Sequence, residues 1–167
     1  ETLIKVKVIC LVLLITTPIF SQNKPKLNRT NSLNIGVVVD PWASIKEKGL
    51  NIGTQLEYVG WGYARVSITS FSVLTYGYTD LIGVYGINFK PQRYDRIRYY
   101  AGGRFGYIQR STNIYSTFGL ELGMDYRINN LLLLGMRGTT DKRNDFKIWN
   151  TPPEMRQSGY IKLGFRL

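Results

Sequence analysis

The sequence contains no histidine among its 167 residues, and this absence excludes much of enzyme chemistry. Ser-His-Asp and Cys-His nucleophile systems, histidine general bases and most catalytic zinc sites all need an imidazole. The serines have no base to activate them, and no metal-ligand spacing or glycine-rich phosphate loop is present. We therefore expect no catalytic residue, no metal site and no cofactor.

Cysteine and long hydrophobic runs are also scarce. The one cysteine, Cys10, lies in the apolar run 8–20, which follows two lysines and precedes polar residues. This run is too short for a spanning helix, which needs roughly 20 residues, but it fits a secretory signal peptide. Pro18 disfavours the alternative, a buried core helix. We expect residues 1–22 to be a signal peptide, residues 23–32 a basic N-terminal tail, and the exported chain to need no disulfide.

The composition of the rest of the chain favours β-strands. Tyr 12, Phe 7 and Gly 17 stand out, and Val, Ile and Thr are spread along the sequence. The 44% hydrophobic and 20% charged residues argue against disorder and against a helical membrane bundle. From Leu33 onward, apolar residues recur at every second position, and no window shows a helical repeat. Residues 33–167 are therefore predicted to form one all-β domain.

The connections between the predicted strands alternate in length. Residues 60–62 and 129–130 form tight turns, whereas 41–49, 72–80 and 141–157 are longer. Short turns on one rim and longer loops on the other are typical of an eight-stranded antiparallel up-and-down transmembrane β-barrel. The predicted strands are Leu33–Asp40, Leu50–Val59, Tyr63–Phe71, Leu81–Lys90, Arg96–Gln109, Ile114–Ile128, Leu131–Thr140 and Ser158–Leu167.

Most of these strands have one apolar and one polar face. A membrane barrel turns the apolar face to lipid, whereas a lipocalin-like soluble barrel turns it inward around a ligand. Aromatic residues near strand ends, glycines on the polar face and charges of both signs there favour the membrane barrel. The strands 33–40 and 81–90 stay ambiguous, because residues 37–39 and 81–82 are apolar on both faces. The clearest apolar stripe, in the last strand, consists of Ile161, Leu163, Phe165 and Leu167.

The charges on the polar face predict an ion network that fills the barrel interior. A pair of carboxylates for hydrolysis is the competing interpretation, but the arginines on the same face favour the structural role. The predicted network consists of Glu57, Arg65, Arg98, Arg104, Glu121, Asp125, Arg137, Lys162 and Arg166.

The longest predicted loop, 141–157, mixes charges with hydrophobic side chains. Such side chains on an exposed loop fold back on the rim or meet a partner, and aromatic anchors are favoured at interface centres. Phe146, Trp149 and Met155 are the candidate recognition residues. A net charge of +11 is compatible with nucleic-acid binding. The basic residues alternate with apolar ones and leave no continuous basic groove, so we expect no nucleic-acid partner.

Three segments, residues 98–106, 118–128 and 159–167, resemble the small outer-membrane β-barrel proteins of Bacteroidota, with an OmpX/OmpA-like barrel. The leader ending at Gln22 is similar to leaders common in that group. The resemblance implies a barrel without catalytic residues, inserted by the barrel assembly machinery, which reads a last strand ending in an aromatic residue. Here the chain ends at Leu167, and Phe165 is the last aromatic residue.

Together these observations predict a non-enzymatic integral outer-membrane barrel with a role in envelope structure, in adhesion or as an assembly subunit. Its expected partners are outer-membrane lipid and lipopolysaccharide, the barrel assembly machinery during insertion, and a protein bound through loop 141–157. Two alternatives stay open. One is a narrow outer-membrane channel, and the other is a secreted lipocalin-like carrier of a hydrophobic ligand.

Overall fold

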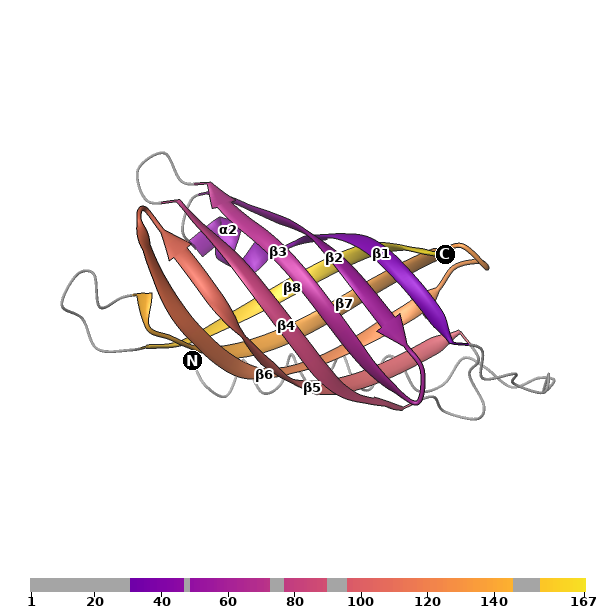
Figure 1. Cartoon of the computed structure of the whole chain (residues 1–167). Helices are drawn as coiled ribbons and strands as arrows, with labels where there is room; N and C mark the ends of the chain where they lie inside the picture. Colours follow the sequence, from indigo (N-terminus) through magenta and orange to yellow (C-terminus); the bar gives the residue numbers. More distant parts are fainter. Residues whose placement is uncertain (1–30, 47–48, 73–76, 90–95, 146–153) are drawn as a thin grey trace, which may run out of the picture.

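The chain forms a closed antiparallel β-barrel (Figure 1). The computed structural model describes residues 31–46, 49–72, 77–89, 96–145 and 154–167. Each strand pairs with its neighbours in sequence, and β1 pairs with β8 to close the sheet. The prediction of an all-β, eight-stranded up-and-down barrel is confirmed. The strands are β1 (Ser32–Val39), β2 (Leu50–Val59), β3 (Gly62–Ser72), β4 (Tyr78–Phe89), β5 (Ile97–Arg110), β6 (Asn113–Arg127), β7 (Leu132–Arg143) and β8 (Glu154–Arg166).

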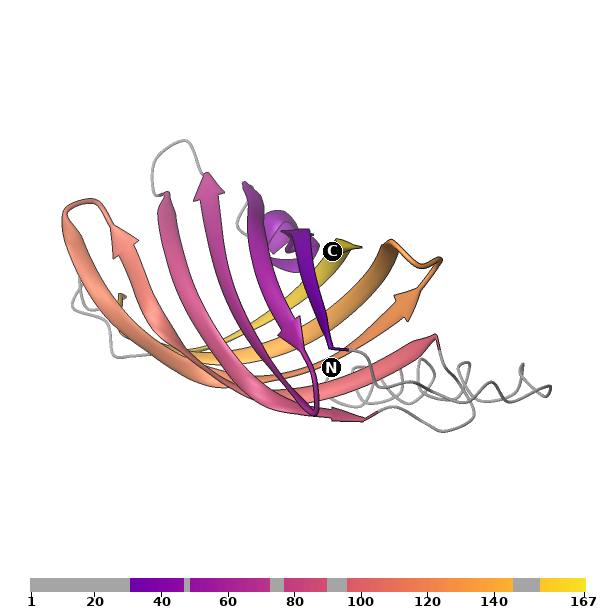
Figure 2. The ribbon, with the colours of Figure 1, turned by 45° about the vertical axis from the view of Figure 1, so that its right-hand side comes forward.

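The two rims of the barrel differ in their connections, and the strands are tilted between them (Figure 2). The terminal rim, where β1 begins and β8 ends, is closed by a backbone hydrogen bond from Leu167 to Leu33. It also carries the short β2–β3 and β6–β7 turns. In the latter, Asn129 Oδ1 accepts hydrogen bonds from the backbone N–H groups of Leu131 and Leu132 at 2.8 and 2.7 Å. The opposite rim, here called the loop rim, carries the β1–β2, β3–β4 and β7–β8 connections. It also carries the tight two-residue turn between β5 and β6, an exception to the contrast between the rims.

The predicted bounds of the loop 141–157 are wrong. Strand β7 continues to Arg143 and β8 begins at Glu154, and these two residues are partners in the ladder. Charged residues dominate this stretch, so its alternation does not show as an apolar pattern. Met155 consequently lies on β8, opposite Lys142, and not in a loop. The predicted signal peptide and most of the predicted tail fall in residues 1–30, outside the described residues.

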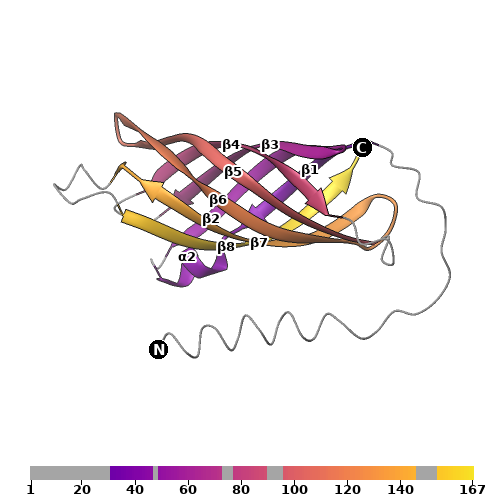
Figure 3. The same ribbon diagram turned by 90° about the horizontal axis from the view of Figure 1, so that it is seen from below.

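A short helix, α2 (Pro41–Lys46), follows β1, although the sequence predicts no helix. Asp40 caps it, because its Oδ1 accepts a hydrogen bond from the Ala43 N–H at 2.8 Å, and Pro41 suits the first helical position. Six residues are too few to produce a detectable helical repeat. Figure 3 shows α2 beside β8 on the outside of the barrel wall. No helix in the described part of the chain is long and apolar enough to cross a membrane.

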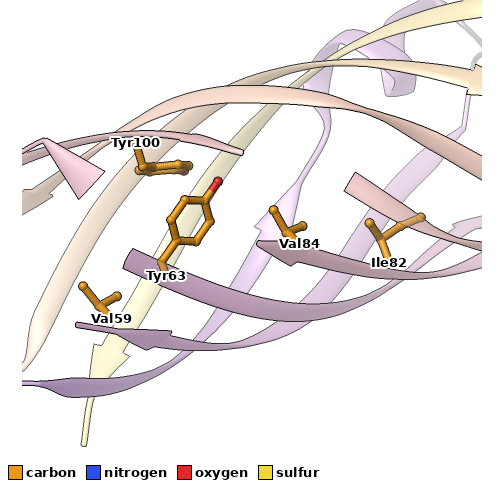
Figure 4. Close-up of a cluster of buried hydrophobic side chains, with 5 residues drawn as sticks. All are labelled: Val59, Tyr63, Ile82, Val84 and Tyr100. Carbon is orange, nitrogen blue, oxygen red and sulfur yellow. The ribbon is translucent and has the colours of Figure 1, made fainter. Parts of the chain in front are cut away.

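The barrel interior combines polar side chains with a small apolar cluster. Val59, Ile82 and Val84 pack around the rings of Tyr63 and Tyr100, which meet edge to face with centroids 5.2 Å apart (Figure 4). Inward-facing glycines make room for these rings. A Cβ added at Gly102 would overlap the Tyr63 hydroxyl, and one at Gly123 would overlap the Tyr100 ring. Glycine on the polar face therefore provides space for large side chains in a narrow lumen.

Candidate functional site

Charged side chains from β2, β3 and β5 to β8 converge in the lumen. Successive side chains of a strand point to opposite faces, so the alternating charges all point inward. Glu57 and Arg65 are fully enclosed there, and the other members of the predicted network except Arg166 are also buried. Arg166 has the same inward direction but is half-buried at the terminal rim.

The half of this network nearer the terminal rim is organised around Glu57 on β2. Its carboxylate accepts hydrogen bonds from Arg65 Nη1 at 3.1 Å and from Arg98 Nη2 at 2.5 Å. Lys162 Nζ lies 3.6 Å from Glu57 Oε1 and 2.7 Å from Asp125, which also pairs with Arg98. Two carboxylates thus face three cations, and the Arg98 and Lys162 pairs with Glu57 join strands that are not neighbours in the barrel.

Glu121 on β6 continues the network toward the loop rim. It accepts hydrogen bonds from Arg65 across the lumen, from Arg104 Nη1 at 3.1 Å and from the Tyr63 hydroxyl at 2.8 Å. Arg104 Nε in turn donates to Asp141 at 2.8 Å. The result is a continuous chain of alternating charge: Asp125, Arg98, Glu57, Arg65, Glu121, Arg104, Asp141.

Arg137 also lies in the lumen, where it contacts the neutral side chains of Gln55 and Tyr160. Its Nη1 donates to Gln55 Oε1 at 2.7 Å, and its guanidinium lies 4.5 Å from the centroid of the Tyr160 ring. Arg137 is on β7 and Gln55 on β2, so this hydrogen bond also crosses the lumen. Polar bridges between non-adjacent strands therefore span the barrel interior at several levels.

A second cluster near the loop rim was missed by sequence reasoning. Asp145, just beyond β7, accepts hydrogen bonds from Arg110 Nη2 at 2.7 Å and Arg143 Nε at 2.9 Å. Both guanidinium groups lie against the Tyr78 ring, at 5.1 and 4.2 Å from its centroid. The strand alternation, extended past Thr139 to Asp141 and Arg143, is the signal that would have found this part of the interior.

The charge of Asp145 should make this cluster sensitive to acid. Burial opposes ionisation of the carboxyl, but hydrogen bonds and charge from Arg143 and Arg110 outweigh it and hold the pKa of Asp145 below its ordinary range. A lowered pKa stabilises the folded state above the unfolded pKa of about 4, and this contribution is lost as the pH falls through the lower, folded value.

We therefore expect Asp145→Asn to lower the free energy of unfolding at pH 7 by about 1.5–3 kcal/mol, the value of hydrogen bonds to charged groups. The difference from wild type should disappear below the folded pKa, where both side chains are neutral. Denaturant unfolding in detergent micelles at several pH values measures it. A deficit that persists unchanged in strong acid would show that the carboxylate charge is not the cause.

Of the three candidate recognition residues, the structure describes only Met155. Phe146 and Trp149 lie outside the described residues, and Met155 is an outward-facing residue of β8 with 63% of its surface exposed. The described residues also contain no group of three or more acidic, cysteine or histidine side chains arranged to hold a metal. The carboxylates Glu57, Glu121 and Asp125 are each held by basic side chains, which suits a structural ion network.

Comparison with solved structures places this architecture among transmembrane barrels. Neisserial surface protein A is 12% identical with a TM-score of 0.56, over 82% of this chain and 96% of that one. The N-terminal β-barrel domain of Pseudomonas aeruginosa OprF is 13% identical with a TM-score of 0.53, over 81% and 97%. A de novo designed transmembrane β-barrel is 15% identical with a TM-score of 0.51, over 89% and 100%.

These likenesses establish the fold alone, because the identities are low. No protein-family model matches the chain, and no curated protein sequence matches it. The function is therefore inferred from the chain's own two surfaces, the lumen and the outer wall.

Proposed function

We propose that this chain is a non-enzymatic integral protein of the outer membrane, closed to diffusion, that serves in envelope structure, in adhesion or as a subunit of a larger assembly. The observation that carries the proposal is the separation of charge between the two surfaces. The lumen holds the continuous ion network, whereas Lys142 is the only charged residue among the outward-facing positions of the described strands.

The outer wall has the chemistry of a lipid-facing surface. Large apolar side chains such as Ile35, Val66, Leu122 and Leu163 stand about half exposed or more around the whole barrel. A continuous apolar surface of this extent is rare on soluble monomers. A lipocalin-like carrier would need these side chains inside, so their outward direction counts against that alternative.

The two ends of the wall carry exposed aromatic residues, as membrane-interface belts do. Tyr58 and Trp61 lie toward the terminal rim, and Phe105 and Tyr107 toward the loop rim. With the tight β2–β3 and β6–β7 turns, this distribution supports a terminal rim in the periplasm and a loop rim outside the cell. Export by a signal peptide and insertion by the barrel assembly machinery are parts of this proposal, as is kinship with the OmpX/OmpA-like barrels of Bacteroidota.

The lumen does not favour the alternative of a narrow channel. Eight strands leave an interior just wide enough for side chains to fill, and here ion pairs cross it from β3 to β6 and from β5 to β2. Opening a path for ions would require these buried pairs to separate, which is costly.

Planar-bilayer recording of the purified chain tests the closed barrel. We expect no steady conductance, together with a need for detergent and a folded band that shifts on heating in gels. Reproducible open-channel steps from the pure protein would favour the channel instead. A monomer that stays soluble without detergent would favour the carrier.

We further propose that contacts with a protein partner are made at the loop rim through residues 144–153 and their Phe146 and Trp149. Replacing both aromatic residues with alanine should leave insertion intact and remove copurifying proteins from native membranes. If every partner is retained, the loop is not the recognition surface.

A further inference from the structure

In the described part of the chain, the outer wall has a hollow that combines an apolar lining with a nearby charge. Gly138 of β7 and Gly159 of β8 are ladder partners and both face outward, so no side chain covers the wall at this point. A Cβ added at Gly138 would meet nothing within 4 Å, and one at Gly159 would meet only the Trp42 Cβ, at 3.9 Å. The glycine pair is therefore not needed for internal packing.

The surrounding side chains give this hollow the volume of a ligand site. Tyr99, Leu122, Met124, Met136 and Ile161 line an open groove of about 520 Å³ around the glycine pair. This volume lies in the range of small-molecule sites, and the lining is apolar. In a membrane no water fills such a space, and leaving it empty would forfeit dispersion contacts along its walls.

The outer wall becomes more polar on the loop-rim side of the hollow. Moving from the glycine pair toward the loop rim, the next outward pair is Thr140 and Gln157, and the following one is Lys142 and Met155. Lys142 lies four residues beyond Gly138, about 13 Å along the strand. Its ammonium nitrogen lies 5.7 Å from the centroid of the Phe118 ring, on the same wall.

A ligand that matches this surface has an apolar chain, which lies in the hollow, and an anionic group, which lies nearer the loop rim. The single outward charge of the described strands is positive and lies on the loop-rim side of this hollow, and α2 with the exposed Trp42 lies beside the hollow, against β8. The position near the loop rim corresponds, under the proposed function, to the outer leaflet. The chemistry that fits is a phosphorylated glycolipid of the lipopolysaccharide class.

We propose that the hollow holds one acyl chain of such a glycolipid and that Lys142 binds its phosphate. This inference rests on the proposed membrane location and adds a defined lipid site to it. The bound lipid would fill the wall between β6 and α2 and fix the height of the barrel in the outer leaflet.

Native mass spectrometry of the folded protein in detergent, titrated with diphosphoryl lipid A, tests the site. We expect a one-to-one adduct that exceeds the adduct with phosphatidylethanolamine. Filling the hollow with Gly138→Leu and Gly159→Leu should weaken lipid A binding about tenfold, because the acyl chain loses its contacts. Lys142→Gln should weaken it about fivefold, the loss of one lysine near an anionic headgroup, and Lys142→Arg should retain it.

Val66→Leu, an outward change on β3 at the other side of the barrel, is the matched control and should bind lipid A as wild type does. The heat-shifted gel band checks folding of every variant, and Lys142→Gln still tests the site if the double leucine variant misfolds. Equal binding of lipid A and phosphatidylethanolamine, or unchanged binding in the folded variants, would overturn the inference and leave the membrane barrel standing. A dimer lost in the double variant would overturn it in favour of a second copy in the hollow.

Discussion

Glu121→Gln should lower the free energy of unfolding by about 3–5 kcal/mol, the cost of removing one partner from a buried ion pair. Glu121 is 2% exposed, and its carboxylate accepts hydrogen bonds from Arg65, Arg104 and the Tyr63 hydroxyl. Glutamine keeps the size of the side chain but not its charge, so two buried guanidinium groups lose a counter-ion. Breaking such pairs is costly even where the intact pair contributes little net stability.

The matched control is Glu154→Gln at the exposed start of β8, where loss of a surface charge should change stability by less than about 1 kcal/mol. Denaturant unfolding in detergent micelles, followed by tryptophan fluorescence, measures both variants. Equal, small effects at the two positions would show that the lumen is wet enough to screen Glu121, and the closed interior would then be wrong.

Leu163→Arg should be the most damaging change on the outer wall. Leu163 is an outward-facing residue of β8 and lies between Ile161 and Phe165 in the outward apolar stripe. An arginine at the bilayer midplane of a barrel costs about 2–4 kcal/mol, and near an interface about 0–1 kcal/mol. We therefore expect Leu163→Arg to lower the free energy of unfolding by the larger amount in lipid vesicles.

Leu33→Arg provides the matched control, because Leu33 also faces outward but lies at the terminal rim, beside Leu167. Its effect should be small, since the long side chain reaches the interface. Unfolding of both variants in vesicles gives the comparison. If the two substitutions cost the same, the wall near Leu163 does not lie at the centre of a bilayer.

The architecture was predictable because the strand period is visible where one face is apolar. In β8, the alternation of Ile161, Leu163 and Phe165 with Lys162 and Gly164 identifies both the strand and the direction of its faces. The same alternation places Glu57, Arg65 and Glu121 together in the lumen. It does so without specifying which carboxylate meets which guanidinium, since that depends on the stagger between strands around the barrel.

Other features could not be predicted because their signals are local or mixed. The helix α2 depends on the Asp40 cap and Pro41 over six residues, too few for a periodic pattern. Strands β1 and β4 carry apolar residues on both faces, and the structure shows why: Val38, Ile82 and Val84 are inward residues that pack inside the lumen. The same inward faces also carry the buried polar residues Asn34 and Asp80. At the loop rim, Asp141 and Arg143 continue β7 with polar residues, which hides the strand from a search for apolar alternation.

A membrane-spanning barrel requires that the outward face of its wall touches lipid, and this contact can be measured directly. Strand β3 suits the measurement, because Val66 and Ile68 face outward and Ser67 and Thr69 face the lumen. Single cysteines at these four positions, introduced in a Cys10→Ser background where the leader is retained, carry a spin label for accessibility measurements in lipid vesicles. We expect labels at 66 and 68 to collide with oxygen dissolved in the bilayer and labels at 67 and 69 not to do so. Labels at 66 and 68 that collide instead with a water-soluble nickel complex would contradict a membrane-spanning barrel.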